Sequence, residues 1–472
     1  MSHHRRIGYK LLLVNPSMRA GGQRAPGGRL PNAGGMATME PLGLAYVGAL
    51  TPPHWQVRIV DEVLEEIPDD DGWGQPDLVG LTSLTVTAPR AYALARRFRE
   101  RGVPVVLGGV HATLVPGEAA RYVDVVFQGE AEGKWETLIQ DFEAGKLKMR
   151  YNGYAAALEG LPLPRRDLYR RRYFLHLLSA SRGCRYRCEF CTLWKMEGGR
   201  HRQRPVPEIL AELEQPGWRR PILFTDENVF TDREWALSLF KGMAERGFHR
   251  PYAVQASLDI AQDDPVLAAL KRSGCMTVLI GFESVCEESL RMMRKGVNLR
   301  IGVAGYRETI ARLHDHGLAA SGTFIFGYDG DGPDIFERTA EFVLESGIDV
   351  AHFGLLTPLP GTDLFNRLAR QGRLLYSNFP RDYARYTLTA ATFRPDHMTP
   401  EQLEEGLVWA TRAVGSRAVA MQRAWHTWLA TRNPAMTAIA YRWNRSGLYQ
   451  RVVPGSNQRQ AGLEQSPERD KA

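Results

Sequence analysis

Short apolar strands alternate with helical stretches along most of this chain of 472 residues. Because strands separated by helices join into parallel sheets through crossover connections, this alternation predicts an α/β fold. The first series predicts a doubly wound, Rossmann-like domain at residues 1–145. Its strands are expected at residues 11–15, 57–60, 78–82, 103–107 and 123–127, with helical stretches such as 41–50 and 90–101 between them.

A second series of strands and helices begins at Tyr173, after a proline-containing linker at 146–172. Six β/α units in about 200 residues are fewer than the eight units of a closed barrel. We therefore expect a partial barrel of the TIM type at residues 173–375. Its strands are expected at residues 175–179, 222–224, 253–257, 277–280, 323–326 and 351–356.

The end of the chain changes character, and residues 376–453 are expected to form a helical region. In Thr399-Pro400-Glu401-Gln402, an N-cap hydroxyl, a proline at the first helical position and a glutamine at the third predict a helix start. Residues 454–472 are polar and lack aromatic side chains, which predicts a disordered tail. The glycine-rich segment 21–35 predicts a loop, either a lid or a disordered connection.

Four tryptophans of the helical region lie among arginines. Tryptophan on a helix more often faces the core, so we expect these side chains to be buried. Contact with a membrane surface or a hydrophobic substrate is the alternative. The tryptophans are Trp409, Trp425, Trp428 and Trp443, and the arginines are Arg412, Arg417, Arg423, Arg432, Arg442 and Arg445.

The composition excludes several classes of protein. A content of 44% hydrophobic and 24% charged residues is typical of globular domains, and no apolar run approaches the ~18 residues of a membrane span. The apolar stretch after the basic N-terminus covers only residues 11–14, too short for a signal peptide, so a cytoplasmic location is predicted. A net charge of +7 is a weak attraction for nucleic acid, and no nucleic-acid partner is expected.

Three of the five cysteines lie within eight positions, as Cys184, Cys188 and Cys191 in a C-x3-C-x2-C pattern. An odd number of cysteines in a chain of this length does not make a disulfide framework. Three thiolates on one loop suit a metal centre, but a structural zinc ion takes four ligands and the local fourth would be His201. A four-iron cluster held by three cysteines would keep one iron free of protein. The other two, Cys275 and Cys286, are expected to be core residues without a function.

With Phe190 as the aromatic residue, the triplet resembles the C-x3-C-x-aromatic-C signature of the radical S-adenosylmethionine (SAM) superfamily. In that superfamily the open iron of a [4Fe-4S] cluster binds SAM, and one electron cleaves SAM to methionine and a 5′-deoxyadenosyl radical. The resemblance implies that Cys184, Cys188 and Cys191 hold the cluster. It also implies an electron donor such as flavodoxin or ferredoxin.

The same resemblance extends to the ends of the barrel strands, over residues 173–375. The segment after the second strand lacks the commoner Gly-Gly-Glu form. For each acidic residue, a solvated strand end or a helix cap is the alternative. The residues that the resemblance assigns to SAM binding are Phe190, Thr225, Asp226, Glu227, Gln255, Ser257 and Glu283.

The first domain lacks both a G-x-G-x-x-G fingerprint and a Walker loop, so a nucleotide site is disfavoured. Next to a radical SAM barrel, this sheet resembles the cobalamin-binding domain of cobalamin-dependent radical SAM enzymes. Ligands of such sheets bind beyond the carboxyl ends of the strands. The candidate cobalamin contacts are Asn15, Pro16, Thr82, Ser83, Thr85, Gly108, Gly109, His111, Gly129 and Glu130.

The cobalt ligand stays open, because the D-x-H-x-x-G motif of many cobalamin proteins is absent. His111 is either an axial ligand or a histidine that stabilises its own loop. The hydroxyls of Thr82, Ser83 and Thr85 either contact the cofactor or cap the strand end.

By family analogy, the resemblance implies an enzyme that methylates an unactivated carbon of a small molecule. The C-terminal helices are similar to those of family members that act on hopanoids and tetrapyrroles, which suggests an apolar substrate. A methylthiotransferase is excluded because its first domain would need cysteines, and none precedes Cys184. Two alternatives remain: a cyclase or rearrangement enzyme, and an iron-sulfur sensor or scaffold without SAM cleavage.

Overall fold

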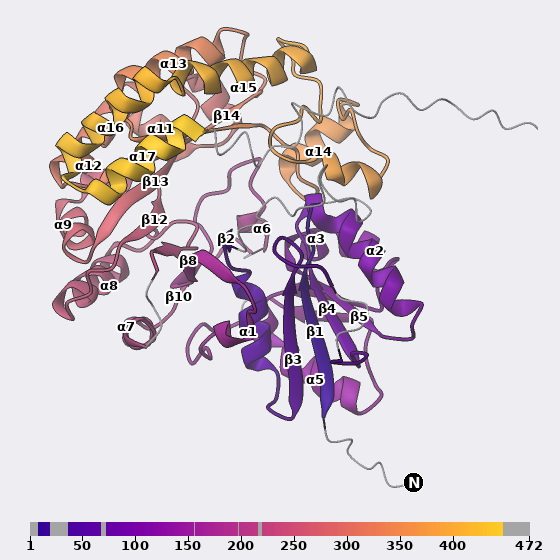
Figure 1. Ribbon diagram of the computed structural model, residues 1–472. Helices are drawn as coiled ribbons and strands as arrows, with labels where there is room; N and C mark the ends of the chain where they lie inside the picture. The colour runs from indigo at the N-terminus through magenta and orange to yellow at the C-terminus, as the bar shows by residue number, and fades with distance from the viewer. Residues whose placement is uncertain are drawn as a thin grey trace, which may run out of the picture.

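The structure, a computed structural model, describes residues 8–18, 36–67, 72–154, 156–196, 198–215 and 220–446. The segments predicted as a glycine-rich loop at 21–35 and as a tail at 454–472 lie outside the described residues. Figure 1 shows the N-terminal sheet beside a curved second sheet, with the last helices on the outer side of the second sheet.

A parallel sheet with helices on both faces forms the N-terminal part, as the alternating pattern predicts. Its strands, in spatial order, are β3 (Trp55–Asp61), β1 (Tyr9–Asn15), β4 (Leu78–Thr82), β5 (Val105–Gly108), β6 (Val125–Gly129) and β7 (Arg150–Gly153). The helices are α1 (Leu42–Leu50), α2 (Ala88–Arg99), α3 (Gly109–Leu114), α4 (Pro116–Ala119) and α5 (Trp135–Glu143).

Strand order reverses between β1 and β4, so the sheet has a topological switch point there. The crevice at such a point is where doubly wound sheets bind ligands. Strand β7 pairs with β6 and lies in the segment predicted as linker, so the sheet extends beyond residue 145.

The second sheet is also parallel and curves into a partial barrel. Its six expected strands are all present, and each is followed by helical structure. In spatial order they are β15 (Val350–Leu355), β14 (Ala319–Phe326), β13 (Cys275–Glu283), β12 (Tyr252–Ala256), β11 (Ile222–Phe224) and β8 (Arg172–Leu178). The helices are α6 (Leu193–Met196), α7 (Val206–Glu214), α8 (Arg233–Glu245), α9 (Asp264–Arg272), α10 (Glu287–Met292), α11 (Gly296–Ile301), α12 (Tyr306–Asp315) and α13 (Ile335–Glu345).

One strand crosses from the first part of the chain to the second sheet. Strand β2 (Met36–Met39) pairs in parallel with β8, at the edge of the barrel sheet. Residues of the N-terminal domain therefore complete the barrel edge on the side where the cysteine segment begins. The apolar run at 41–50 gave no sign of this short strand before it.

The C-terminal region is helical, with α14 (Asp363–Arg370), α15 (Pro400–Val414), α16 (Arg417–Thr431) and α17 (Pro434–Ser446). Helix α15 begins with the predicted capping box, because Thr399 and Gln402 each accept a hydrogen bond from the other's backbone N–H. Its inner face buries Leu403, Leu407, Ala410 and Val414.

The prediction that the four tryptophans are buried is wrong for two of them. Trp409 is 48% exposed and Trp425 is 59% exposed, whereas Trp428 and Trp443 are partly buried. On α16 the face that packs on the barrel carries small residues and the buried Arg423, which leaves no room for an indole there.

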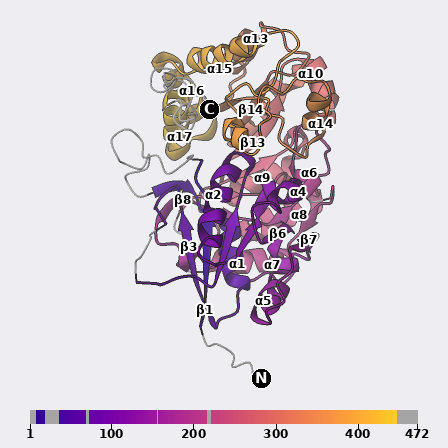
Figure 2. The same ribbon diagram turned by 90° about the vertical axis from the view of Figure 1, so that its right-hand side faces the viewer.

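The two sheets pack with their ligand-binding ends toward each other (Figure 2). A segment beyond the barrel also packs on the first domain, because Tyr383 and Tyr386 join the core between its sheet and α2. In the part of the chain that the structure describes, no helix is long and apolar enough to span a membrane.

Candidate active site

The cysteine loop follows β8, the first strand of the barrel. A two-residue strand, β9 (Ser181–Arg182), pairs with β10 (Arg202–Gln203) and leads directly into Cys184. The loop then folds back on itself, since the Cys191 N–H and the Trp194 indole N–H both donate to the Cys188 carbonyl, at 3.2 and 3.0 Å. Cys188 is buried, and Cys184 and Cys191 are partly buried.

Burial raises the pKa of all three thiols, and that of Cys188 to about 11. The ammonium of Lys295 lowers the pKa of each thiol, while charge on the neighbouring thiols raises that of Cys188. Three thiols on one loop, close enough for their charges to shift one another's pKa, fit a cluster in which each sulfur binds a separate iron. A structural zinc ion takes four ligands, whereas a four-iron cluster can be held by three cysteines, so three thiols on one loop fit a cluster.

Asp226 and Glu227, after β11, hold the start of the cysteine loop. The Asp226 carboxylate is fully buried and accepts from the N–H groups of Ala180 and Ser181, at 3.1 and 2.5 Å. Burial raises its pKa to about 6. Glu227 accepts from the Gly183 N–H at 2.8 Å, and burial raises its pKa as well. Both carboxylates therefore position the backbone that leads into Cys184.

The predicted residues of the next strands form a hydrogen-bonded row beside the loop. Ser257 accepts from Asn228 at 3.0 Å and donates to Asp259 at 2.5 Å. Asp259 in turn accepts from Arg185 at 2.9 Å, so the row reaches the residue after Cys184. The partly buried Gln255 lies on β12, and its backbone carbonyl accepts a hydrogen bond from the Val229 N–H at 3.0 Å.

Glu283, at the end of β13, lies in the left-handed region with φ of 65°. Its carboxylate accepts from Lys295 at 3.0 Å, and both side chains are largely buried. A non-glycine residue at positive φ is uncommon and persists where its surroundings hold it, here the ion pair and a strand end. Lys295 was not predicted as a site residue, because a lysine 12 positions after a strand has no sequence signal.

A second ion network holds the middle of the loop. Arg367, on α14, donates to both oxygens of Glu189, at 2.8 and 3.0 Å, and to Asp329 at 2.5 Å. Arg373 donates to the other oxygen of Asp329 at 2.6 Å. Phe190, next to Glu189, packs edge-on toward Tyr328 with ring centroids 6.3 Å apart. These contacts between distant segments also lay beyond sequence patterns.

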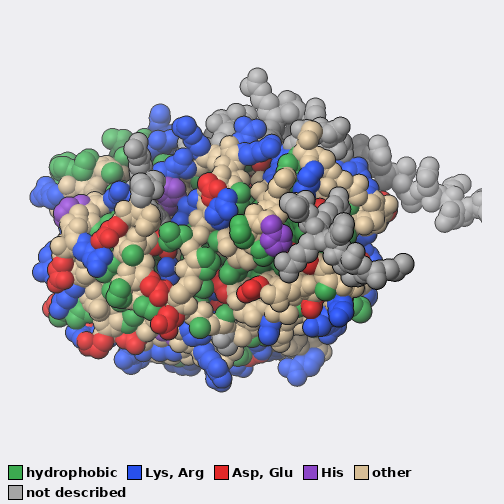
Figure 3. All heavy atoms as spheres, turned by 90° about the horizontal axis from the view of Figure 1, so that it is seen from below, with side chains coloured by type: hydrophobic (Ala, Val, Ile, Leu, Met, Phe, Trp, Pro, Cys, Tyr) green, Lys and Arg blue, Asp and Glu red, His purple; other side chains and the backbone are tan. Residues whose placement is uncertain are grey.

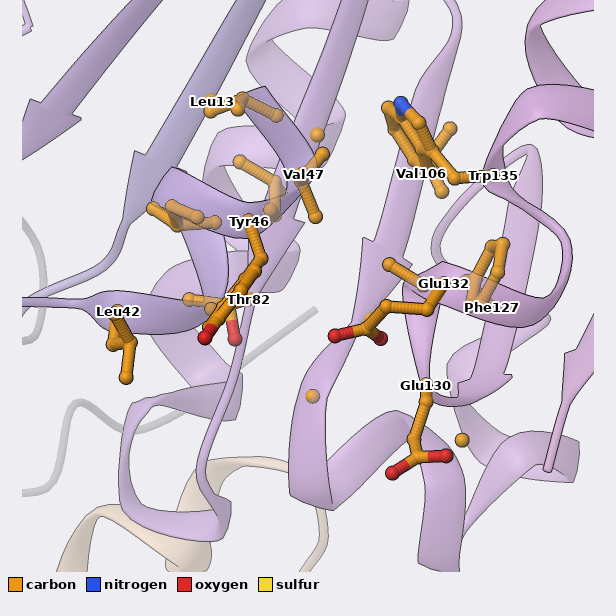
Figure 4. A pocket seen from close by; sticks show the side chains of 18 of the residues that line it. Leu13, Leu42, Tyr46, Val47, Thr82, Val106, Phe127, Glu130, Glu132 and Trp135 are labelled. Atoms are coloured by element: carbon orange, nitrogen blue, oxygen red, sulfur yellow. The ribbon is translucent and has the colours of Figure 1, made fainter. Parts of the chain in front are cut away.

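A cavity of about 370 Å³ lies between the ends of the two sheets. Residues of the N-terminal domain form most of it, and Ser179, Arg182 and Thr225 of the barrel complete it. Figure 4 shows Tyr46 and Thr82 on one side of the cavity and Glu130 and Glu132 on the other. Glycines form part of the lining, so backbone is exposed to a ligand at Gly43, Gly80, Gly108, Gly109 and Gly129.

The structure brings five of the ten candidate cobalamin residues to this cavity: Thr82, Gly108, Gly109, Gly129 and Glu130. The other five, Asn15, Pro16, Ser83, Thr85 and His111, are not among the lining residues. Asn15 donates to Asp61 at 2.9 Å, at the neighbouring strand end.

His111 is completely buried among protein groups. Its Nε2 lies 3.0 Å from the Tyr92 hydroxyl and 3.3 Å from Glu118, and its Nδ1 lies 3.5 Å from the Thr85 hydroxyl. Tyr383 donates to the same Glu118 at 2.9 Å. With both ring nitrogens near protein partners, this arrangement matches a histidine that stabilises its loop.

Two buried hydroxyls near the cavity have no hydrogen-bond partner among the described residues, those of Tyr46 and Ser83. Tyr46 lines the cavity from α1, and burial raises its pKa to about 12. Buried polar atoms are rarely left unsatisfied, so these hydroxyls fit a ligand with amide or other polar groups at its edge. Tyr46 was missed as a site residue because the apolar pattern of its helix predicts a core position.

An ion network joins the cavity to the cysteine loop. Arg182 donates to Glu130 at 2.8 Å and to Glu132 at 2.6 Å, and Arg202 donates to both oxygens of Glu130 at 2.7 Å. Arg182 lies two positions before Cys184, whereas both glutamates follow β6 of the first domain. The two ligand-binding ends are thus tied through buried charges.

Two family models match the chain, one for the radical SAM superfamily over residues 178–343 and one for the B12 binding domain over residues 36–139. The bacteriochlorophyllide d C-12(1)-methyltransferase of Chlorobaculum tepidum is 30% identical over 406 residues, which cover 82% of this chain and 85% of that relative. The chain belongs to the cobalamin-dependent radical SAM enzymes. The matched regions coincide with the barrel and with the sheet that lines the cavity.

Further similarities agree with this family. An anaerobic magnesium-protoporphyrin IX monomethyl ester cyclase of Rubrivivax gelatinosus is 23% identical over 438 residues, 84% of this chain and 75% of that relative. The structure of the radical SAM methyltransferase TsrM of Kitasatospora setae, with tryptophan and a SAM analogue bound, has a TM-score of 0.68 and 17% identity. The match covers 94% of this chain and 99% of TsrM, so nearly all of the chain shares the fold.

The comparisons confirm two predictions. The chain belongs to the radical SAM methyltransferases, and the cofactors of this family are an iron-sulfur cluster, SAM and cobalamin. They also confirm the predicted fold, a Rossmann-like sheet with a partial barrel and C-terminal helices. A small-molecule substrate agrees with the relatives named above.

Proposed function

We propose that this radical SAM enzyme transfers a methyl group to an unactivated carbon of an apolar, tetrapyrrole-like small molecule. One observation carries the proposal: the carboxyl ends of the two sheets line a common cavity. Cofactors bound by the two domains would then meet over the same substrate atom. The kinship with a bacteriochlorophyllide methyltransferase supports both the reaction and the class of substrate.

In this proposal Cys184, Cys188 and Cys191 bind the cluster, and the carboxylates of Glu227 and Glu283 contact SAM beside it. Both carboxylates lie at the ends of barrel strands, next to the cysteine loop or to a buried cation. When bound, the cluster and SAM supply a radical that removes hydrogen, and cobalamin supplies the methyl group.

Cobalamin would lie against the glycine-lined end of the first sheet. Gly108 and Gly109 expose backbone there, and the hydroxyl of Thr82 and the unpartnered hydroxyl of Tyr46 would hydrogen-bond polar groups of the cofactor. Added side chains at Gly109 would collide with Thr82, so the close approach of the backbone depends on glycine.

The remaining residues of the site position the cysteine loop and enclose it. Asp226 and Arg367 hold the cysteine loop from two directions, Arg367 through Glu189, and Arg182 ties the loop to the first domain. Buried ion pairs of this kind fix geometry more than they add stability, which suits a site where distances decide the rate. An electron donor such as flavodoxin or ferredoxin, and a cytoplasmic location, belong to the proposal.

The test is an anaerobic assay of the full-length chain, reconstituted with iron, sulfide, hydroxocobalamin and SAM and then reduced. A chlorin serves as one candidate substrate and a hopanoid as the other. Methylated chlorin together with 5′-deoxyadenosine and S-adenosylhomocysteine in similar amounts supports the proposal. Release of 5′-deoxyadenosine with altered but unmethylated chlorin supports the cyclase or rearrangement alternative and overturns methylation.

Variants with matched cysteine changes test the site. Cys188→Ala should abolish the cluster absorbance and SAM cleavage. Cys286→Ala is the control, since this partly buried thiol packs against the barrel core and contacts the Gly330 carbonyl. SAM cleavage that survives in Cys188→Ala would refute the assignment of the triplet.

A further inference from the structure

The outer face of α16 carries an apolar row that nothing in the described chain uses. Met421, Trp425 and Leu429 are spaced four residues apart, so they lie on one face of the helix, and they are 63%, 59% and 44% exposed. Trp409, on the preceding helix α15, is exposed as well. Exposed apolar side chains that form a row, rather than single positions, mark interaction surfaces.

The opposite face of α16 already supplies the contacts that hold this helix to the barrel. Ala420, Ala424 and Thr427 are buried there, and the buried Arg423 donates to the Ile348 carbonyl at 2.9 and 3.2 Å. The outer row is therefore free of any role in packing α16.

Charge gives this face its second property. No aspartate or glutamate occurs from Gly406 to Leu463, a stretch of 58 residues with eight arginines. At the frequency of the whole chain, 53 acidic residues in 472, such a stretch would carry about six. Arg417 begins the apolar row one turn before Met421, and Arg432 follows its end; both are exposed.

The rest of the surface differs. At the far end of the molecule, acidic and basic side chains are interspersed (Figure 3). Helices α16 and α17 run along the outer edge of the barrel in Figures 1 and 2. A helix with an apolar row, arginines and no acidic residue has the composition of helices that lie in the interface of anionic membranes, where tryptophan is also enriched.

We propose that α16 forms a docking surface for an anionic lipid bilayer, in which Met421, Trp425 and Leu429 enter the interface while Arg417 and Arg432 contact lipid headgroups. A second copy of the chain fits this face less well, because an isologous contact would bring arginines against arginines. The surface does not depend on the proposed reaction.

Its position leaves the active site accessible. Ile348, which Arg423 of α16 contacts, precedes β15. Helix α17 buries Met436 against Ala319 and Val350, which are the first residues of β14 and β15. The helices therefore cover the amino ends of the barrel strands, whereas the cysteine loop follows the carboxyl end of β8. Docking would hold the enzyme at the bilayer without covering the cavity.

Vesicle sedimentation tests the proposal with the full-length chain. Vesicles of phosphatidylcholine are compared with vesicles that contain about 30% phosphatidylglycerol, at about 0.1 M salt. We expect sedimentation with the anionic vesicles. The variant Arg417→Glu with Arg432→Glu should bind at least about 25-fold more weakly, since each arginine at an anionic surface adds about five-fold.

Removing the apolar row is the second arm. Met421→Ser with Trp425→Ser and Leu429→Ser should weaken binding at least about ten-fold, and a cooperative melting transition shows that the variant is folded. The matched control is Met149→Ser with Leu163→Ser, which changes exposed apolar residues elsewhere and should bind as the wild type does.

Three results would overturn the proposal. The first is a wild-type chain that stays in solution with the anionic vesicles, and the second is a row variant that sediments like its control. The third is a wild-type dimer, measured by light scattering, that the row variant dissociates, because a second copy would then cover this face.

Discussion

Arg367→Met should loosen the cysteine loop without touching a cysteine. The guanidinium makes two hydrogen bonds to Glu189, at 2.8 and 3.0 Å, and one to Asp329 at 2.5 Å. Asp329 keeps Arg373 as a partner in the variant. Glu189, which is 6% exposed, loses the cation that both of its carboxylate oxygens contact.

The expected cost follows from that buried carboxylate. Breaking a buried ion pair by removing one partner costs about 3 to 5 kcal/mol. Because the Arg367 side chain is 25% exposed, water can reach part of the gap, and the lower end, about 3 kcal/mol, applies. In a domain of barrel size this corresponds to a fall of about 6 to 12 °C in melting temperature.

Calorimetry of the cluster-free protein measures this fall, with all variants compared at one scan rate because chains of several domains do not melt as two states. Arg370→Met is the control: among the described residues this exposed arginine of the same helix donates only to the Asn366 carbonyl, and its loss should cost under about 0.5 kcal/mol. Glu189→Gln closes a double-mutant cycle, with a coupling to Arg367→Met above about 1 kcal/mol. Iron content after reconstitution should fall with Arg367→Met and not with Arg370→Met. Equal melting of the two arginine variants, or no coupling in the cycle, would refute the role of this ion pair.

Three further predictions concern the first-domain side of the cavity and the cysteine loop. Gly109→Ala should lower the free energy of unfolding, measured in urea, by about 2 to 4 kcal/mol and reduce cobalamin retention. The reason is that φ of Gly109 is +89° and an added Cβ would lie 2.6 Å from the Thr82 hydroxyl. Gly117→Ala, at a position with open space around it, should change neither quantity. Burial raises the pKa of Asp226 from 3.8 to about 6, so the folded state binds a proton that the unfolded state has released, and the wild type loses stability as the pH rises from about 4 to 6. The unfolding midpoint of Asp226→Asn should therefore gain on that of the wild type between about pH 4 and pH 6 and stay level with this gain above about pH 7. A difference that is constant across about pH 4 to 6 would contradict this. Lys295→Met removes the ammonium that lowers the pKa of Cys188, so less iron should be incorporated at neutral pH, and unchanged iron content would refute that role.

Local patterns were enough to predict every strand of the two sheets except β2 and β7. Alternation of short apolar runs with helical stretches placed each barrel strand, and the capping box placed the start of α15 at Pro400. These features depend on neighbours in sequence, which is why one sequence suffices for them. Strand β2 escaped because its pairing partner, β8, lies more than 130 positions away.

The candidate site divides in the same way. The cysteine triplet has a fixed spacing and was therefore visible, as were the carboxylates that end β11 and β13. Lys295 and Arg367 were not, because each acts on a residue from another part of the chain. Tyr46 was missed for a different reason. The apolar pattern of its helix predicts a core position, and only its unpartnered hydroxyl in the cavity distinguishes it from a core residue.

The cysteine loop itself has little regular structure, so its place depends on what surrounds it. Asp226 holds its start from the barrel, Arg367 of α14 holds its middle through Glu189, and Arg182 ties it to Glu130 and Glu132 of the first domain. A loop held only by the barrel would set the position of SAM independently of cobalamin. With the third tie, the sheet that faces the cavity and the loop proposed to bind the cluster share one buried ion network. Since methyl transfer requires two cofactors to reach one carbon, a shared network is the arrangement that keeps their separation constant.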